Sequence, residues 1–154
     1  MKKAFLILGL LVTFFIVSAH DAFAQEKTQQ QIEIQSDPLL EADAKANLEA
    51  AQTYFRTRKA YRAVLMRFEE TFAAYPNYSK MDEFLYMAGM SSYYLSQNKG
   101  KQKITAASTD GEKERFAPAR LREEATMYLT MLVEKYPNSK FKSDAEKTLK
   151  ELKK

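Results

Sequence analysis

Two similar stretches of the sequence decide the fold: "FEETFAAYPNYSKMDE" at residues 68–83 and "MLVEKYPNSKFKSDAE" at residues 131–146. Each stretch begins with apolar residues at helical spacing, reaches Tyr-Pro-Asn, and starts a new run shortly afterwards. Proline lacks the backbone N–H that a helix interior needs, and its ring collides with the preceding turn, so each Tyr-Pro pair ends a helix. The repetition predicts two helical hairpins that follow one another along the chain.

Apolar spacing predicts two helices before the first Tyr-Pro pair. The first helix is expected from about Pro38 to Arg56, with Asp37 as its N-cap and Pro38 at the first helical position. Its apolar residues recur every three or four positions: Leu40, Ala44, Leu48, Ala51 and Phe55. The chain is expected to turn at residues 57–60. The second helix then presents the face Tyr61, Leu65, Phe68, Phe72 and Tyr75.

The second half of the sequence predicts three more helices around a loop. The third helix is expected to open at Ser79, with a capping box between Ser79 and Asp82, and to end at Gln97. Residues 98–117 contain two glycines, many charges and few apolar groups, which predicts a long solvated loop. Pro118 restarts a helix that ends at Tyr136, and a last helix begins near residue 141. Five helices and no strand indicate an all-α domain.

Aligning the two Tyr-Pro pairs superimposes residues 61–76 on residues 122–137. In both copies a small or β-branched residue lies twelve positions before the proline, a large apolar residue lies eight before it, and tyrosine directly precedes it. The repeat positions that we expect to be structural are Tyr61, Phe68, Tyr75, Pro76, Ala125, Leu129, Tyr136 and Pro137. This pattern resembles the second helix of a tetratricopeptide repeat, a hairpin of about 34 residues. The prolines are 61 residues apart, and the loop at 98–117 accounts for most of the excess.

A narrower resemblance rests on "YPNS" followed by Ser143-Asp144-Ala145 and a short charged helix. These residues resemble the repeats of BamD-type outer-membrane assembly factors and of repeat proteins associated with the Tol-Pal system, over residues 44–152. The two copies of the pattern indicate a short solenoid of two repeats plus a C-terminal capping helix, and the resemblance implies a protein or peptide partner and no cofactor. Two departures bear on the role: BamD-type proteins are lipid-anchored through a cysteine, which this sequence lacks, and they carry more repeats.

The N-terminus has the features of a bacterial secretory signal peptide. Lys2 and Lys3 precede an apolar run at residues 4–19, and Ala22-Phe23-Ala24 is a small-x-small cleavage motif. We therefore expect a signal peptide at residues 1–24, a flexible polar linker at 25–36 and the helical domain at 37–154. The expected location is the periplasm. An uncleaved signal that anchors the protein in the inner membrane is the alternative, although the apolar run is shorter than the roughly 18 residues of a spanning helix.

Composition excludes several classes of chemistry. The 154 residues contain no Cys and one His, His20, which lies in the predicted signal peptide. The mature chain would therefore have no disulfide, no thiolate or imidazole ligand for a metal, and no nucleophilic mechanism that depends on Cys or His. The net charge of +4 belongs to the C-terminal part, because residues 99–154 carry 14 basic and 9 acidic side chains. Nucleic acid is not an expected partner for a modestly basic protein outside the cytoplasm.

The third predicted helix has a second apolar stripe formed by Tyr86, Met90, Tyr93 and Gln97. Because this helix is apolar around most of its circumference, one interpretation is that it is buried between its neighbours. The other is that the stripe lines a groove that receives a partner's helix or extended segment, for which Tyr and Met are suitable anchors.

Two basic segments form a second candidate site. They supply Arg56, Arg58, Lys59 and Arg62 from "RTRKAYR", and Lys99, Lys101 and Lys103 from "NKGKQK". Together they could attract anionic lipid headgroups, lipopolysaccharide or an acidic partner. A solvated helix junction and a solvated loop are the alternatives.

These features favour a non-catalytic periplasmic adaptor that docks envelope proteins or their unfolded segments, in the manner of outer-membrane protein assembly. The association with the outer membrane would then not depend on a lipid anchor. The alternative is an enzyme, or an accessory protein, of cell-wall processing that acts through carboxylates. Such an enzyme needs two acids that face each other across a cleft, roughly 5 to 10 Å apart.

Overall fold

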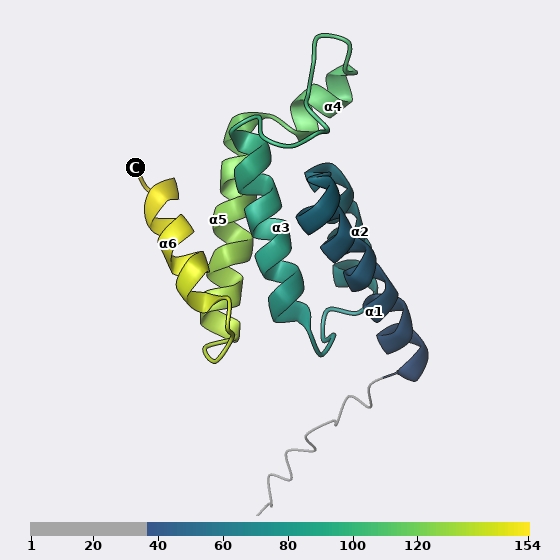
Figure 1. The fold of residues 1–154 in the computed structure, drawn as a ribbon. Helices are drawn as coiled ribbons and strands as arrows, with labels where there is room; N and C mark the ends of the chain where they lie inside the picture. Colours follow the sequence, from purple (N-terminus) through teal and green to yellow (C-terminus); the bar gives the residue numbers. More distant parts are fainter. Residues whose placement is uncertain (1–36) are drawn as a thin grey trace, which may run out of the picture. The chain divides into compact units, whose positions relative to one another are not determined.

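A computed structural model describes residues 37–154 of the chain, and the expected signal peptide (1–24) and linker (25–36) lie outside the described residues. The described part is all helical, without strands (Figure 1). Its elements are α1 (Pro38–Thr53), the π-helical turn η1 (Tyr54–Arg58), α2 (Tyr61–Ala74), α3 (Met81–Ser96), α4 (Asp110–Arg115), α5 (Pro118–Lys135) and α6 (Lys142–Leu152). The predicted all-α class is confirmed.

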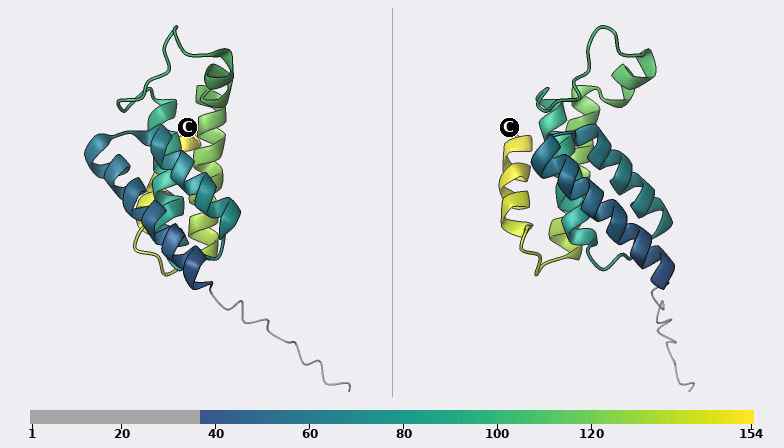
Figure 2. Two further views of the ribbon diagram at one scale, coloured as in Figure 1. Left: turned by 90° about the vertical axis from the view of Figure 1, so that its right-hand side faces the viewer. Right: turned by 45° about the vertical axis from the view of Figure 1, so that its right-hand side comes forward.

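The helices stack as two hairpins and a closing helix. α1 packs against α2, α3 packs against both α2 and α5, and α6 packs against α5 (Figures 1 and 2). Side-chain contacts also join α3 to α1 and to α6, so α1, α3 and α6 form one layer while α2 and α5 form the other. This is the short tetratricopeptide-like solenoid of two repeats plus a capping helix that the sequence predicts.

Both Tyr-Pro turns are held in the same way. After the first turn, the Ser79 hydroxyl donates a hydrogen bond to Glu41 in α1; after the second, the Ser139 hydroxyl donates to Asp82 of α3 at 2.7 Å. Each serine therefore ties a turn back to the start of the preceding helix in the same layer. The predicted capping box at Ser79 is wrong, because α3 begins at Met81 without a side-chain cap and the two groups bond elsewhere.

The core is continuous through both hairpins. Phe68 of α2 packs edge-on against Phe84 of α3 and against Tyr128 of α5, with ring centroids 5.8 and 4.8 Å apart. Burial raises the pKa of Tyr128 to about 12, so this phenol is neutral at physiological pH. Among residues 37–154, every buried core side chain lies between Ala44 and Thr148. The described residues therefore carry a core of their own and are expected to fold without the N-terminal segment.

The repeat positions predicted to be structural lie where packing needs them. Ala125 and Leu129 are fully buried between α3 and α5, and Phe68, Tyr61 and Tyr75 are buried as well. Tyr136 is half-buried, and both prolines are exposed at the turns.

The ends of two predicted segments differ from expectation. The first helix gives way to the π-helical turn η1 after Thr53, and the helical run stops at Lys59, whose backbone is left-handed with a φ of 51°. Residues 98–117 contain the short helix α4, where the sequence pattern predicts only a loop. A capping box between Thr109 and Glu112 starts α4, and the Arg62 and Arg115 side chains pair with Glu112 and Glu69 to join it to α2.

Candidate functional site

A groove of about 360 Å³ lies between α3 and α6. Its α3 wall consists of Tyr86, Met90 and Tyr93, three of the four residues of the predicted stripe, together with Tyr94. The opposite wall is polar, and the remaining lining residues are Lys99, Asp144, Lys147, Thr148 and Glu151. The stripe therefore faces a groove with an aromatic side and a charged side.

Three contacts connect the stripe to α6 and its N-cap. The Tyr86 ring stacks on the ring of Phe141 with centroids 4.7 Å apart, and the Tyr93 hydroxyl donates a hydrogen bond to Glu151 Oε2 at 2.6 Å. The Thr148 hydroxyl lies 3.5 Å from Met90 Sδ. Met90 is buried while Tyr86 and Tyr93 are half-buried. The stripe thus both attaches α6 and lines the groove, so each interpretation of its role describes part of the arrangement.

Both tyrosines of the stripe are neutral donors at physiological pH. Burial raises the pKa of Tyr86, and the nearby Asp144 carboxylate adds to the effect. The hydrogen bond to Glu151 is the main cause that raises the pKa of Tyr93, followed by burial. The groove consequently offers phenol hydroxyls, aromatic faces and charged groups of both signs. This mixture can hold the backbone and side chains of a protein segment.

The aromatic surface continues from the groove toward η1. The Phe55 ring lies 6.4 Å from that of Tyr86 and 6.2 Å from that of Tyr94. The sequence pattern places Phe55 on the core face of the first helix and does not single out Tyr94 or Phe141. Tyr94 could have been found from the sequence, because it is aromatic and directly follows the stripe residue Tyr93.

Gln97 does not share the groove with the rest of the stripe. It is exposed at the C-cap of α3, and its side chain forms a hydrogen bond with the Tyr93 hydroxyl. Gln97 is not among the lining residues of the groove, and a role for it in binding stays a prediction.

The structure separates the predicted basic patch into two groups. Arg56 pairs with Glu83 at 3.3 Å, and Arg62 pairs with Glu112 and lies over the Phe116 ring. Within residues 37–154, no carboxylate forms an ion pair with the other five members: Arg58, Lys59, Lys99, Lys101 and Lys103. These five residues are all exposed.

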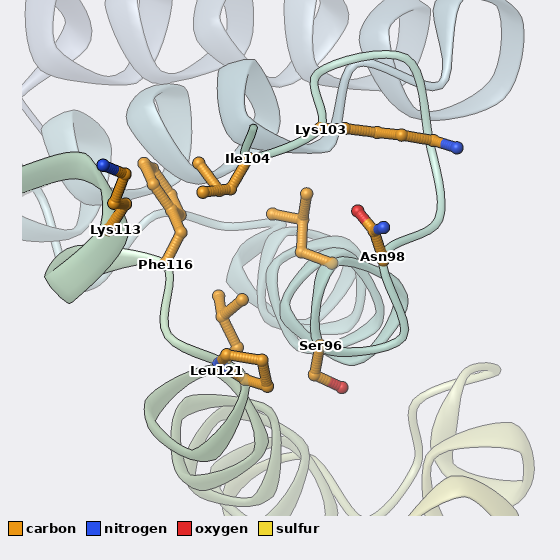
Figure 3. A pocket seen from close by; sticks show the side chains of 9 residues that line it. Ser96, Asn98, Lys103, Ile104, Lys113, Phe116 and Leu121 are labelled. Carbon is orange, nitrogen blue, oxygen red and sulfur yellow. The ribbon is translucent and has the colours of Figure 1, made fainter. Parts of the chain in front are cut away.

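A second cavity, of about 400 Å³, lies under the segment that contains α4 (Figure 3). The C-terminal end of α3, the N-terminal end of α5 and the residues before and after α4 enclose it. Leu95, Ile104, Phe116 and Leu121 provide its apolar lining, and Lys103 lies at its rim with its ammonium group directed away from the apolar floor (Figure 3).

Residues 38–154, from the start of α1 to the end of the chain, match a family model described as "YfiO: Outer membrane lipoprotein". The chain belongs to the YfiO family. No curated protein and no solved structure has a significant match to it. Membership confirms the predicted resemblance to BamD-type repeat proteins and places the chain among proteins of the cell envelope.

Lipoproteins of this kind carry their lipid on cysteine, and this YfiO-family sequence of 154 residues contains no cysteine. Within residues 37–154, no helix combines the length and apolarity needed to cross a bilayer.

Within residues 37–154, the α3–α6 groove and the cavity under α4 do not place two carboxylates on facing walls. In the α3–α6 groove the two acids, Asp144 and Glu151, both belong to α6 and therefore line one wall. A hollow between α1 and α2 has Asp43 and Glu70 on opposite helices, but its volume is only about 100 Å³. Small-molecule sites in proteins usually measure about 300 to 1,000 Å³.

Proposed function

We propose that this YfiO-family chain is a non-catalytic periplasmic adaptor that holds a segment of another envelope protein in the α3–α6 groove, as part of outer-membrane protein assembly. One observation supports this proposal above the others: Tyr86, Met90 and Tyr93 line the same open groove, opposite the polar side chains of α6. Tetratricopeptide-like solenoids use such surfaces between successive repeats to bind partners.

The chemistry of the groove suits a peptide better than a small metabolite. Half-buried Tyr86 and Tyr93 can pack against apolar side chains of the bound segment, because their rings are already fixed by Phe141 and Glu151 and lose little freedom on binding. Lys99 and Lys147 can pair with acidic groups, and Asp144 can pair with a basic one. The partner would then be an amphipathic segment that carries at least one apolar anchor.

The proposal also includes export and cleavage of the chain before Gln25, which would leave the domain in the periplasm. An uncleaved anchor in the inner membrane would place the same groove in the same compartment. Intact-mass measurement of the protein isolated from envelopes distinguishes the two forms.

Site-specific photocrosslinking in living cells tests the groove. A photoreactive amino acid replaces Lys147, which is exposed on the groove wall, and as a control it replaces Met127, which is 49% exposed on α5 and does not line the groove. We expect reproducible adducts with the same envelope protein from position 147 and not from position 127. The absence of adducts at 147, or equal adducts from both positions, would contradict the proposal.

A pair of substitutions checks that the aromatic wall provides the affinity. Tyr93→Phe removes the hydroxyl that bonds Glu151 and Gln97 but keeps the ring, whereas Tyr94→Ala removes one ring of the wall without a contact to α6. We expect Tyr94→Ala to weaken the crosslink at position 147 several-fold while circular dichroism shows an intact fold. Crosslinking that is unchanged by Tyr94→Ala would indicate that the segment binds elsewhere.

A further inference from the structure

The structure joins two basic segments that are about forty residues apart in the sequence. The Lys101 N–H donates a hydrogen bond to the Lys59 carbonyl oxygen at 3.0 Å, and the Ala63 N–H donates to Gln102 Oε1 at 3.1 Å. Gly100, directly before Lys101, has a φ of 98°. It lies so close to Tyr61 that a Cβ on Gly100 would be 2.6 Å from the Tyr61 ring. The junction after η1 and the loop after α3 therefore form one surface. We call Arg58, Lys59, Lys99, Lys101 and Lys103 the basic end.

The basic end keeps its charge. Elsewhere in residues 37–154 the Arg side chains that approach a carboxylate are neutralised, as Arg56 is by Glu83 and Arg62 by Glu112. None of the five members of the basic end has such a pair in this part of the chain. Five exposed cations at one end of the helices produce a local positive potential that attracts anions from the surrounding solution.

Aromatic and apolar groups lie directly beside these cations. Arg58 lies over the Tyr54 ring at 5.6 Å and Lys99 over the Tyr94 ring at 5.8 Å. The apolar cavity under α4 adjoins Lys103, with half-buried Ile104 next to it. Lysines with long apolar stems, tyrosine rings and a nearby apolar surface are the groups that proteins place at a membrane–water interface.

We propose that the basic end docks the protein on a bilayer surface that carries anionic phosphate headgroups. The cations are spread over one surface and are not arranged around a single buried point, so they match a plane of phosphates better than one bound anion. Docking through the basic end would direct the Tyr-Pro turns away from the bilayer, because the turns and the basic end lie at opposite ends of α3 (Figure 1). The proposal does not depend on what the α3–α6 groove binds, although Lys99 borders both surfaces.

Vesicle cosedimentation tests the proposal with residues 25–154, which contain the core of the described residues and omit the apolar run at 4–19 that would itself enter lipid. The probe is a vesicle with about one third phosphatidylglycerol in phosphatidylcholine, compared with phosphatidylcholine alone. The test variant combines Lys59→Asn, Lys101→Gln and Lys103→Gln and leaves Lys99 in place. Asn suits position 59 because it tolerates the left-handed backbone there.

We expect the wild type to bind the anionic vesicles and not the neutral ones, and to be released as salt rises well above about 0.1 M. Each lysine near an anionic surface raises partition about fivefold, so the triple variant should lose about a hundredfold. The matched control, Lys80→Gln, Lys135→Gln and Lys140→Gln, removes the same charge beside the Tyr-Pro turns and should change partition less than about fivefold. Circular dichroism verifies that all three proteins are folded.

Three results would overturn the proposal. If the wild type does not bind the anionic vesicles, the basic end recognises no lipid surface. If it binds polyglutamate in place of the vesicles, an acidic protein becomes the better candidate. If the two triple variants lose partition equally, binding follows net charge and not the basic end. The crosslinking experiment at position 147 does not depend on vesicle binding, so failure of the lipid-docking proposal is distinguishable from failure of the proposed adaptor function.

Discussion

Gly89 shows how one residue sets the distance between two helices. It lies in α3 and is buried against Leu129 of α5, which is itself fully buried. A Cβ built on Gly89 would be 2.6 Å from Cγ and Cδ2 of Leu129. Ala125 is the small residue on the α5 side. Small residues at these positions let α3 and α5 pack closely.

We predict that Gly89→Ala destabilises the protein by up to about 2 kcal/mol. Alanine gains about 1 kcal/mol of helix propensity, but overpacking a core that cannot relax costs about 1 to 3 kcal/mol. Urea denaturation measures the difference. Gly111→Ala in α4 is the control, since no neighbouring atom lies within 4 Å of the position that its Cβ would occupy, and it should be neutral or slightly stabilising. Equal stability of Gly89→Ala and the wild type would mean that Leu129 moves aside freely.

At the scale of elements, α4 is a helix that tertiary contacts hold in place. Six residues cannot sustain a helix in water by themselves. The capping box between Thr109 and Glu112 satisfies free amides at its start. Glu112 also accepts from Arg62 of α2, and Arg115 pairs with Glu69. Glu112 is therefore the residue on which both the cap and one anchor of α4 depend.

We predict that α4 loosens in acid before the rest of the protein. Its hydrogen bond with Arg62, followed by the one from the Thr109 backbone, lowers the pKa of Glu112. Because the pKa of Glu112 is lowered in the folded state, its ionised carboxylate stabilises α4 at pH values above the usual glutamate pKa. This stabilisation is lost as the pH falls through the lowered pKa. When the pH is lowered below about 4, the amide protection factors of residues 110–116, measured by hydrogen exchange, should decrease.

The substitution Glu112→Gln should lower these protection factors at neutral pH as well, because it removes the charge from both interactions. Glu114→Gln is the matched control in the same helix, and it should leave them unchanged because this side chain makes no ion pair in residues 37–154. Equal effects of the two substitutions would show that Glu112 does not anchor α4.

At the scale of the whole domain, the two hairpins share a single core. Phe68 belongs to the first hairpin, yet its ring contacts Phe84 and Tyr128 of the second. In long repeat arrays each unit interacts only with its neighbours, and parts of the array can unfold separately. With two units joined through buried aromatic rings, this domain has one set of contacts that must be lost together.

We predict a single cooperative unfolding transition for residues 25–154, with the same midpoint by circular dichroism and by tyrosine fluorescence. Phe68→Ala should lower the stability of both hairpins by about 3 to 5 kcal/mol. Met66→Ala is the control on the same helix, where the side chain is 60% exposed, and should change stability by less than about 0.5 kcal/mol. Early loss of α1 and α2 while α3 and α5 remain folded would contradict the prediction.

Sequence determined the all-α class, the two hairpins and the closing helix, because proline placement and apolar spacing are local properties that a chain displays before it folds. The residues at each Tyr-Pro turn could be named, and α2 and α5 end directly before Tyr75 and Tyr136. Local signals also misled: Ser79 has the pattern of a capping box with Asp82, but its hydroxyl bonds Glu41, which is distant in sequence.

Only the tertiary structure decided which of the predicted sites face each other. The Tyr86 stripe became a groove wall because Phe141, Thr148 and Glu151 of a later segment lie against it. The seven predicted basic residues divided into neutralised and free members because Glu83 and Glu112 reach only two of them. α4 formed inside a segment with almost no apolar pattern, held by partners in α2. Each of these outcomes depends on pairs of residues far apart in the chain, which spacing along one sequence does not encode.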